Sequence, residues 1–300
     1  MPVLSDYSDT LIFGSECADP ARLWKAAELA EGEEGQSKMA EALRGGMRAG
    51  EAYAALVGES DGLSSNDLLG VAYLRAIMRL ERPLAYEVVA RKGADYRDET
   101  MTEGQYPSAT AIRRLWREGQ WKSAACGLPT QSEELFRAAY ERGELTDARE
   151  LDQGILTFFR LHDGGDFEGI AEAGGGIANR ICALARECVS AEELFAALRT
   201  KQYTDARLRR AMLYCMTGVK ASLLKQAPEY TLLLGANEAG RALLAERRKT
   251  ARIPVLTKPA DGPRESAQWN AESALQALFT LARPQKADAG ALLRKSAVIL

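Results

Sequence analysis

The feature that most constrains this chain is a strand followed by a loop and the start of a helix. The run 85–91 is β-like, and the segment 106–116 begins a helix with Ile112, Leu115 and Trp116 on one face. A strand that leads into a capped helix is the local unit of α/β folds. We therefore expect an α/β region around this segment.

The start of that helix has the features of an anion site. Ser108 or Thr110 can cap the first turn, and Arg113 follows within one turn. The unpaired N–H groups, the positive end of the helix dipole and the guanidinium would then converge on one anion, with phosphate as the obvious candidate. A capped surface helix with Arg113 in solvent is the alternative interpretation.

Composition describes an ordinary globular chain. With 300 residues, of which 46% are hydrophobic and 27% charged, it is long enough for two domains. No apolar run approaches the roughly 20 residues of a membrane span, and the N-terminus lacks the pattern of a secretory signal. The five cysteines are odd in number and lack metal-ligand spacing, so we expect small buried hydrophobes rather than a metal or catalytic site. We expect a cytoplasmic protein that does not enter a membrane.

The net charge of -3 hides an asymmetry. Residues 199–258 carry about 13 Lys or Arg against about 4 Asp or Glu, so this stretch is near +9 and the remainder is near -12. Arg207 and Arg210 follow Thr204 on one helix, where arginines three apart can track a phosphate backbone. The stretch predicts RNA binding, and a solvated basic face without a partner is the alternative.

Residues 9–13 are expected to form a short buried strand that ends at Gly14, where the backbone must come close to another group or turn sharply. We expect residues 11–13 and 86–91 to be parallel neighbours in one sheet.

Local patterns place the other elements. Asp19 and Pro20 start a helix, and Ser64 or Ser65 caps another whose apolar residues are Leu68, Leu69, Ala72, Ile77 and Leu80. Four helical segments are expected at 133–140, 151–161, 177–186 and 191–198. A small strand-helix-strand unit is expected at 230–234, 237–249 and 253–257, with Lys258 where its second strand ends. We interpret Gly174 to Gly176 as the loop before a helix, because no strand precedes it.

Seven segments resemble, in order, bacterial tRNA(Met) cytidine acetate ligases, which are nucleotidyltransferase-like enzymes. They are 11–17, 63–74, 89–96, 108–113, 201–210, 234–241 and 252–258. The resemblance implies a helix-rich α/β fold, with a partial Rossmann-like nucleotidyltransferase domain over 1–121. A mostly helical domain over 122–300, with the strand-helix-strand unit, would follow.

The resemblance also implies site residues. The family contacts ATP through residues that match Gly14, Asn66 and Arg91, and the helix start at Ser108, Thr110 and Arg113 would complete this site. A capping role for Asn66 and a solvent-exposed Arg91 are the alternatives. The region that contributes to tRNA binding in the family carries Lys201, Arg207, Arg210 and Lys258 here.

The complete family enzyme activates acetate with ATP and acetylates N4 of the wobble cytidine in elongator tRNA(Met). Family members open with a Pro-Phe-His-Asn-Gly-His loop that holds ATP, whereas the single histidine here is His162. By this comparison roughly 90 residues of the first domain are absent. We therefore expect a truncated chain that is inactive alone, assign no catalytic residue, and expect weak or lost ATP binding.

Two other hypotheses stay open. A non-enzymatic tRNA-binding module would need only the basic stretch. A purely structural protein would leave the matches at Gly14, Asn66 and Arg91 without a reason. The incomplete first domain also predicts an open sheet edge and self-association.

Overall fold

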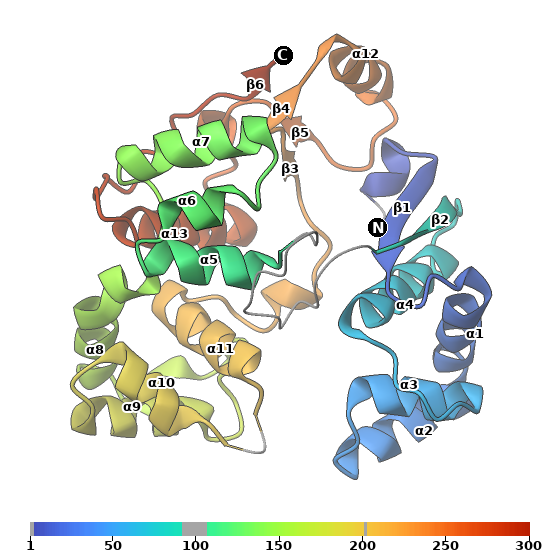
Figure 1. Ribbon diagram of the computed structural model, residues 1–300, viewed down its shortest axis with the longest axis horizontal. Helices are drawn as coiled ribbons and strands as arrows, with labels where there is room; N and C mark the ends of the chain where they lie inside the picture. Colours follow the sequence, from blue (N-terminus) through green and yellow to red (C-terminus); the bar gives the residue numbers. More distant parts are fainter. Residues whose placement is uncertain (1–2, 92–106, 201–202) are drawn as a thin grey trace. The chain divides into compact units, whose positions relative to one another are not determined.

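The computed structural model describes residues 3–91, 107–200 and 203–300 (Figure 1). The chain forms two compact units. The first comprises Met1–Pro129 and Leu243–Arg252, and the second comprises Thr130–Ala242 and Ile253–Leu300. Our domain boundary near residue 121 stays a prediction, since compact units and folding domains need not coincide.

The first unit combines a two-stranded sheet with several helices. Its elements, in chain order, are η1 (Leu4–Asp6), β1 (Thr10–Ser15), α1 (Pro20–Glu31), α2 (Glu33–Arg44), α3 (Ala49–Val57), α4 (Ser65–Met78), β2 (Ala85–Ala90), α5 (Ala109–Arg117) and α6 (Trp121–Ala125). The start of α1 is as predicted, because Asp19 accepts a hydrogen bond from the Arg22 N–H at 3.0 Å and Pro20 follows it. The inner face of α1 is buried: Leu23, Ala26, Ala27 and Ala30.

The predicted pairing of the two strands is confirmed. Strand β1 (Thr10–Ser15) pairs in parallel with β2 (Ala85–Ala90) along its whole length, and the two arrows run side by side in Figure 1. One face of the sheet packs on α1 and α4, where the Phe13 and Tyr73 ring centroids are 5.7 Å apart. The other face leaves Ile12 60% exposed. Within the described ranges this sheet has no third strand.

The buried face of α4 differs from the predicted one. Leu69 is 46% exposed, whereas Val71 and Leu74 are fully buried. Gly70 provides the reason, because a Cβ there would lie 2.6 Å from Phe13 Cε2. Gly70 lies on the face of α4 that packs on the sheet, and its lack of a side chain leaves room for the Phe13 ring. Because glycine adds no apolar side chain to the pattern, hydrophobic periodicity does not identify this face of the helix.

The second unit is mostly helical. Its elements are α7 (Thr130–Glu141), η2 (Ala148–Leu151), α8 (Asp152–Arg160), η3 (Gly164–Phe167), α9 (Ile177–Glu187), α10 (Ala191–Leu198), α11 (Asp205–Thr217), η4 (Leu223–Lys225), β3 (Thr231–Leu232), β4 (Gly235–Ala236), α12 (Glu238–Arg247, shared with the first unit), β5 (Val255–Leu256), η5 (Pro259–Asp261), α13 (Ala267–Leu281) and β6 (Val298–Ile299). Helices α8 to α11 enclose a core in which Phe159, Ile181 and Leu194 are fully buried. The four predicted helices of this region are confirmed, and Gly176, with φ of 82°, precedes α9 as the predicted loop requires.

The predicted strand-helix-strand unit is also present. Strands β3 and β5 are parallel neighbours, with α12 between them in the chain. The C-terminal segment, to which sequence reasoning assigned no element, forms β6 and pairs in parallel with β4. Strands β4 and β6 have two residues each, which is too short for an alternation of apolar and polar residues to show, so the sequence could not predict this pairing.

Candidate functional site

Gly14 and Arg91 meet at the carboxyl ends of the two parallel strands. The Arg91 N–H donates to the Ser15 carbonyl at 3.0 Å, and the Arg91 side chain crosses Gly14. A Cβ at Gly14 would lie 3.0 Å from Arg91 Cγ. Gly14 lies inside β1 rather than ending it, so its role is close approach to Arg91, one of the two roles predicted for it.

Asn66 joins this group through a residue that sequence reasoning did not single out. It occupies the first turn of α4, as predicted, and its Nδ2 donates to Glu16 Oε1 at 2.5 Å. Arg91 Nε lies 3.4 Å from the same oxygen, and Ser64 Oγ donates to Glu16 Oε2 at 2.5 Å. Two of the three residues matched to ATP contacts, Asn66 and Arg91, therefore meet on the carboxylate of Glu16, and the third, Gly14, lies against the Arg91 side chain.

The Glu16 carboxylate decides what this site can bind. Its side chain is 40% exposed and that of Arg91 is 44% exposed, so both can be reached from solvent. A phosphate oxygen and the carboxylate would compete for the same donors on Ser64, Asn66 and Arg91. A phosphate group can therefore use these donors only where Glu16 moves aside.

Asp67 fixes the loop that carries Glu16. It is 3% exposed, and its Oδ1 accepts from Ser15 Oγ at 2.5 Å and from the Glu16 and Cys17 N–H groups at 3.0 and 3.2 Å. Its Oδ2 accepts from the N–H and hydroxyl of Ser64 at 3.2 and 2.7 Å. Burial alone would raise the pKa of Asp67, but these hydrogen bonds outweigh burial and lower the pKa to about 2. Asp67 is a positioning residue, and its Ser64-x-x-Asp67 spacing is a capping-box signal that the sequence did offer.

The second half of the predicted ATP site lies on α5. Ser108 caps this helix by accepting from the Ala111 N–H at 3.0 Å, which resolves the choice between Ser108 and Thr110. Arg113 is exposed, and α5 packs on α6. Residues 92–106, between β2 and this helix, lie outside the described ranges. The convergence of Ser108, Thr110 and Arg113 with Gly14 on one anion stays a prediction.

The predicted RNA-binding arginines lie on one face of α11. Arg210 NH2 is 2.9 Å and Arg207 Nε is 3.5 Å from the two carboxylate oxygens of Glu172. Lys258 is exposed just beyond β5, and Lys201 lies outside the described residues. The basic stretch does not belong to one compact unit, because Leu243–Arg252 falls in the first and the rest in the second.

Aromatic rings lie beneath several arginines of this surface. The Arg207 guanidinium carbon is 4.8 Å from the centre of the Tyr203 ring. Phe195 lies under both Arg209 and Arg199, at 4.6 and 5.2 Å. Rings with guanidinium groups over them are a usual means of binding unpaired nucleotides, because both groups can stack on bases.

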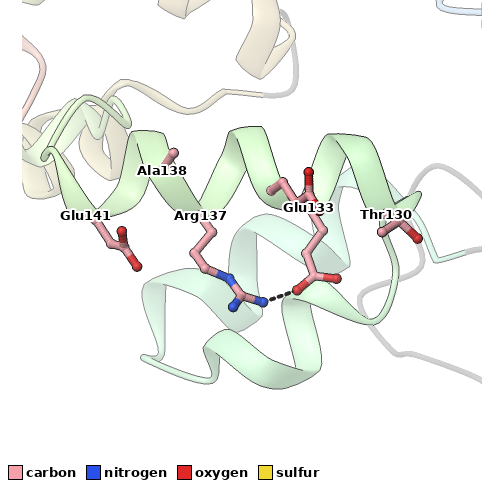
Figure 2. Close-up of a pocket in the computed structure, with 6 residues that line it drawn as sticks. Thr130, Glu133, Arg137, Ala138 and Glu141 are labelled. Atoms are coloured by element: carbon pink, nitrogen blue, oxygen red, sulfur yellow. Dashed lines mark hydrogen bonds and ion pairs between the residues drawn. The ribbon is translucent and has the colours of Figure 1, made fainter.

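A shallow depression on the second unit is not part of either group. Figure 2 shows that its lining comes from α7 alone, with Glu133 and Arg137 paired along the helix. Groups from a single helix face do not converge on a ligand, so the depression is helix surface.

Cysteines and the histidine form no reactive cluster in the described part of the chain. Cys182, Cys188 and Cys215 are buried as predicted, but Cys17 is half-buried and Cys126 is exposed. His162 Nδ1 lies 2.8 Å from the Phe158 carbonyl just beyond α8, as expected of a residue at a helix end. Among the described residues there is no metal-ligand group and no helix that could span a membrane.

A family model described as HIGH Nucleotidyl Transferase matches residues 4–291. The chain belongs to this family. Curated relatives of this HIGH nucleotidyl transferase are named tRNA(Met) cytidine acetate ligase. The Thermotoga maritima protein is 31% identical over 198 residues, which are 64% of this chain and 47% of the relative. The Fervidobacterium nodosum protein is 27% identical over 261 residues, which are 82% of this chain and 61% of the relative.

The chain spans about half the length of the first curated relatives it matches. Its fold is similar to a crystal structure of Thermotoga maritima TmcAL in the apo form, with a TM-score of 0.85 and 24% identity over 99% of this chain and 79% of that chain. TmcAL bound with alpha-thio ATP gives a TM-score of 0.83 and 24% identity over 99% and 78%. This likeness confirms the predicted helix-rich, nucleotidyltransferase-like α/β fold.

Proposed function

We propose that this HIGH nucleotidyl transferase is a cytoplasmic tRNA(Met) cytidine acetate ligase-like protein that does not catalyse the reaction alone. In the complete reaction ATP activates acetate as an acetyl-adenylate with release of pyrophosphate, and the acetyl group then passes to N4 of the wobble cytidine of elongator tRNA(Met) as AMP leaves. The relatives' names support the reaction class. The observation that carries the proposal is the grouping of Gly14, Asn66 and Arg91 at the strand ends, where open α/β sheets bind their ligands. Asn66 and Arg91 contact the Glu16 carboxylate there, and Gly14 lies against the Arg91 side chain.

ATP binding by the 300-residue chain is expected to be weak, with a Kd no better than about millimolar, because Glu16 occupies the donors. Calorimetry should detect no binding to Asn66→Ala or Arg91→Gln. Glu16→Gln should bind about tenfold more tightly, since it removes a negative charge from the phosphate site.

Arg82→Gln is the matched control for Arg91→Gln. Arg82 is an exposed arginine near the other end of β2, 3.7 Å from Asp9, and its loss should leave ATP binding unchanged. A micromolar Kd for the unaltered chain, or full binding by Arg91→Gln, would contradict this site.

tRNA binding is expected through the face of α11. The variant Arg207→Gln with Arg210→Gln should bind tRNA about tenfold more weakly at moderate salt, and the salt dependence should flatten because fewer phosphates are neutralised. Gln is preferred to Glu because two new carboxylates beside Glu172 would disturb the fold. The control is Arg137→Gln with Arg142→Gln on and just after α7. If both pairs change the gel shift equally, the arginines of α11 have no special role.

A non-enzymatic tRNA-binding module is the second candidate, and the arginines over Tyr203 and Phe195 favour it. Acetate-dependent exchange of pyrophosphate into ATP separates the two. We expect none from this chain alone, since the donors near the strand ends are engaged with Glu16. Measurable exchange would establish the enzyme.

A further inference from the structure

Glu172 has an unusual backbone. Its φ is 61°, in the left-handed region that residues with a Cβ seldom adopt, and Ala18 is the one other non-glycine residue of this kind in the described ranges. Gly175 and Gly176, with φ of 67° and 82°, complete the turn into α9. This turn directs the Glu172 side chain to α11. An unfavourable backbone conformation at a surface residue indicates that interactions of its side chain compensate for the cost.

The Glu172 carboxylate bridges two arginines. Oε1 accepts from Arg210 Nε at 3.0 Å and lies 2.9 Å from Arg210 NH2, while Oε2 lies 3.5 Å from Arg207 Nε. The Glu172 side chain is 26% exposed, against 39% and 47% for Arg207 and Arg210. The arginines are therefore accessible to a ligand, while the carboxylate between them is the more covered group.

A second acid, Asp205, is arranged differently. Asp205 lies in the first turn of α11, and its ion pair among the described residues is with Arg199, which follows α10, at 2.9 Å. Arg209 lies over Phe195 instead. Glu172 is thus the acid that comes from a distant segment and holds two of the arginines proposed to bind RNA.

We propose that Glu172 is a built-in competitor for an RNA phosphate, a proposal that rests on the RNA binding proposed above. One carboxylate and one phosphodiester each carry a single negative charge, and both fit between two guanidinium groups. Glu172 keeps Arg207 and Arg210 oriented in the absence of RNA and leaves them when a phosphate arrives. Because the Glu172 carboxylate already neutralises Arg207 and Arg210, RNA binding to these two arginines has a weaker net electrostatic gain and a smaller salt dependence than binding to two unpaired arginines.

The test is fluorescence anisotropy of a labelled, unmodified elongator tRNA(Met) transcript at several salt concentrations. Glu172→Gln should bind about tenfold more tightly at low salt and show a steeper salt dependence, by about one to two further counterions. Glu172→Asp keeps the charge but withdraws it by one carbon, and Asp tolerates the left-handed region well. It should bind about threefold more tightly than the unaltered chain.

Asp205→Asn is the matched control, because it removes one carboxylate from the same surface without freeing two arginines. If tRNA affinity rises no more for Glu172→Gln than for Asp205→Asn, the proposal is overturned. It is also overturned if Glu172→Asp does not raise the affinity, since general repulsion between the carboxylate and RNA would then explain the effect of Glu172→Gln. No binding by the unaltered chain or any variant at low salt would overturn RNA binding itself. Equal binding by all of them would overturn only the role of Glu172. Circular dichroism of each variant confirms that it is folded.

Discussion

Replacing Asp67 with Asn is expected to destabilise the first unit by about 3 kcal/mol at pH 7. The carboxylate is 3% exposed and accepts hydrogen bonds from Ser15, Glu16, Cys17 and Ser64. Asn keeps one acceptor oxygen, but its NH2 group replaces the other oxygen and faces N–H or O–H donors with which it cannot form the same hydrogen bonds. Urea titration followed by tryptophan fluorescence measures the effect, because three of the four tryptophans lie in the first unit.

The loss of stability caused by Asp67→Asn should become smaller as the pH falls. The pKa of Asp67 is lowered to about 2 in the folded protein, below the value of an unfolded Asp, so the folded state favours the charged form. Its contribution, about 2 kcal/mol from the shift, is fully present above about pH 5 and is lost as the pH falls toward 2. The stability difference between Asp67→Asn and the unaltered chain should therefore shrink over this range.

Asp61→Asn is the control, since Asp61 is an exposed residue of the same unit. It should change the free energy of unfolding by no more than about 0.5 kcal/mol at either pH. If Asp67→Asn behaves like Asp61→Asn at pH 7, the Asp67 hydrogen bonds do not stabilise the loop that carries Glu16.

Signals contained within a few residues predicted the structure well. The caps at Asp19, Ser64, Ser108 and Thr204 are all observed, because a cap needs only a side chain and an N–H group three residues later. The parallel pairing of the two strands was also predicted, and the long helical connection between them suits parallel strands.

The partners of charged groups could not be predicted in the same way. Glu16 is far from Asn66 and Arg91 in sequence, and Glu172 is 38 residues from Arg210. Their pairing depends on how helices pack, which no local pattern encodes. The sequence therefore singled out Asn66, Arg91, Arg207 and Arg210 as candidate binding residues but did not identify Glu16 and Glu172, the acids that pair with them.

Gly164→Ala is expected to destabilise the second unit by about 3 kcal/mol. Gly164 begins η3, which packs on the first turn of α9. A Cβ at this position would overlap the Asn179 side chain and lie 2.7 Å from Asn179 Cα. Rotation of Asn179 cannot remove the backbone contact, so α9 or η3 has to move.

The adjacent glycine gives a matched control, because a Cβ at Gly165 would have no heavy atom within 4 Å. Gly165→Ala should leave the free energy of unfolding within about 0.5 kcal/mol or raise it slightly, since Ala has less freedom in the unfolded chain. Amide hydrogen exchange locates the effect: peptides from α9 should exchange faster in Gly164→Ala, while those from β1 and β2 should not. Equal stability of the two variants would show that η3 and α9 are not in the close contact described here. Faster exchange in both units would show instead that the two unfold together.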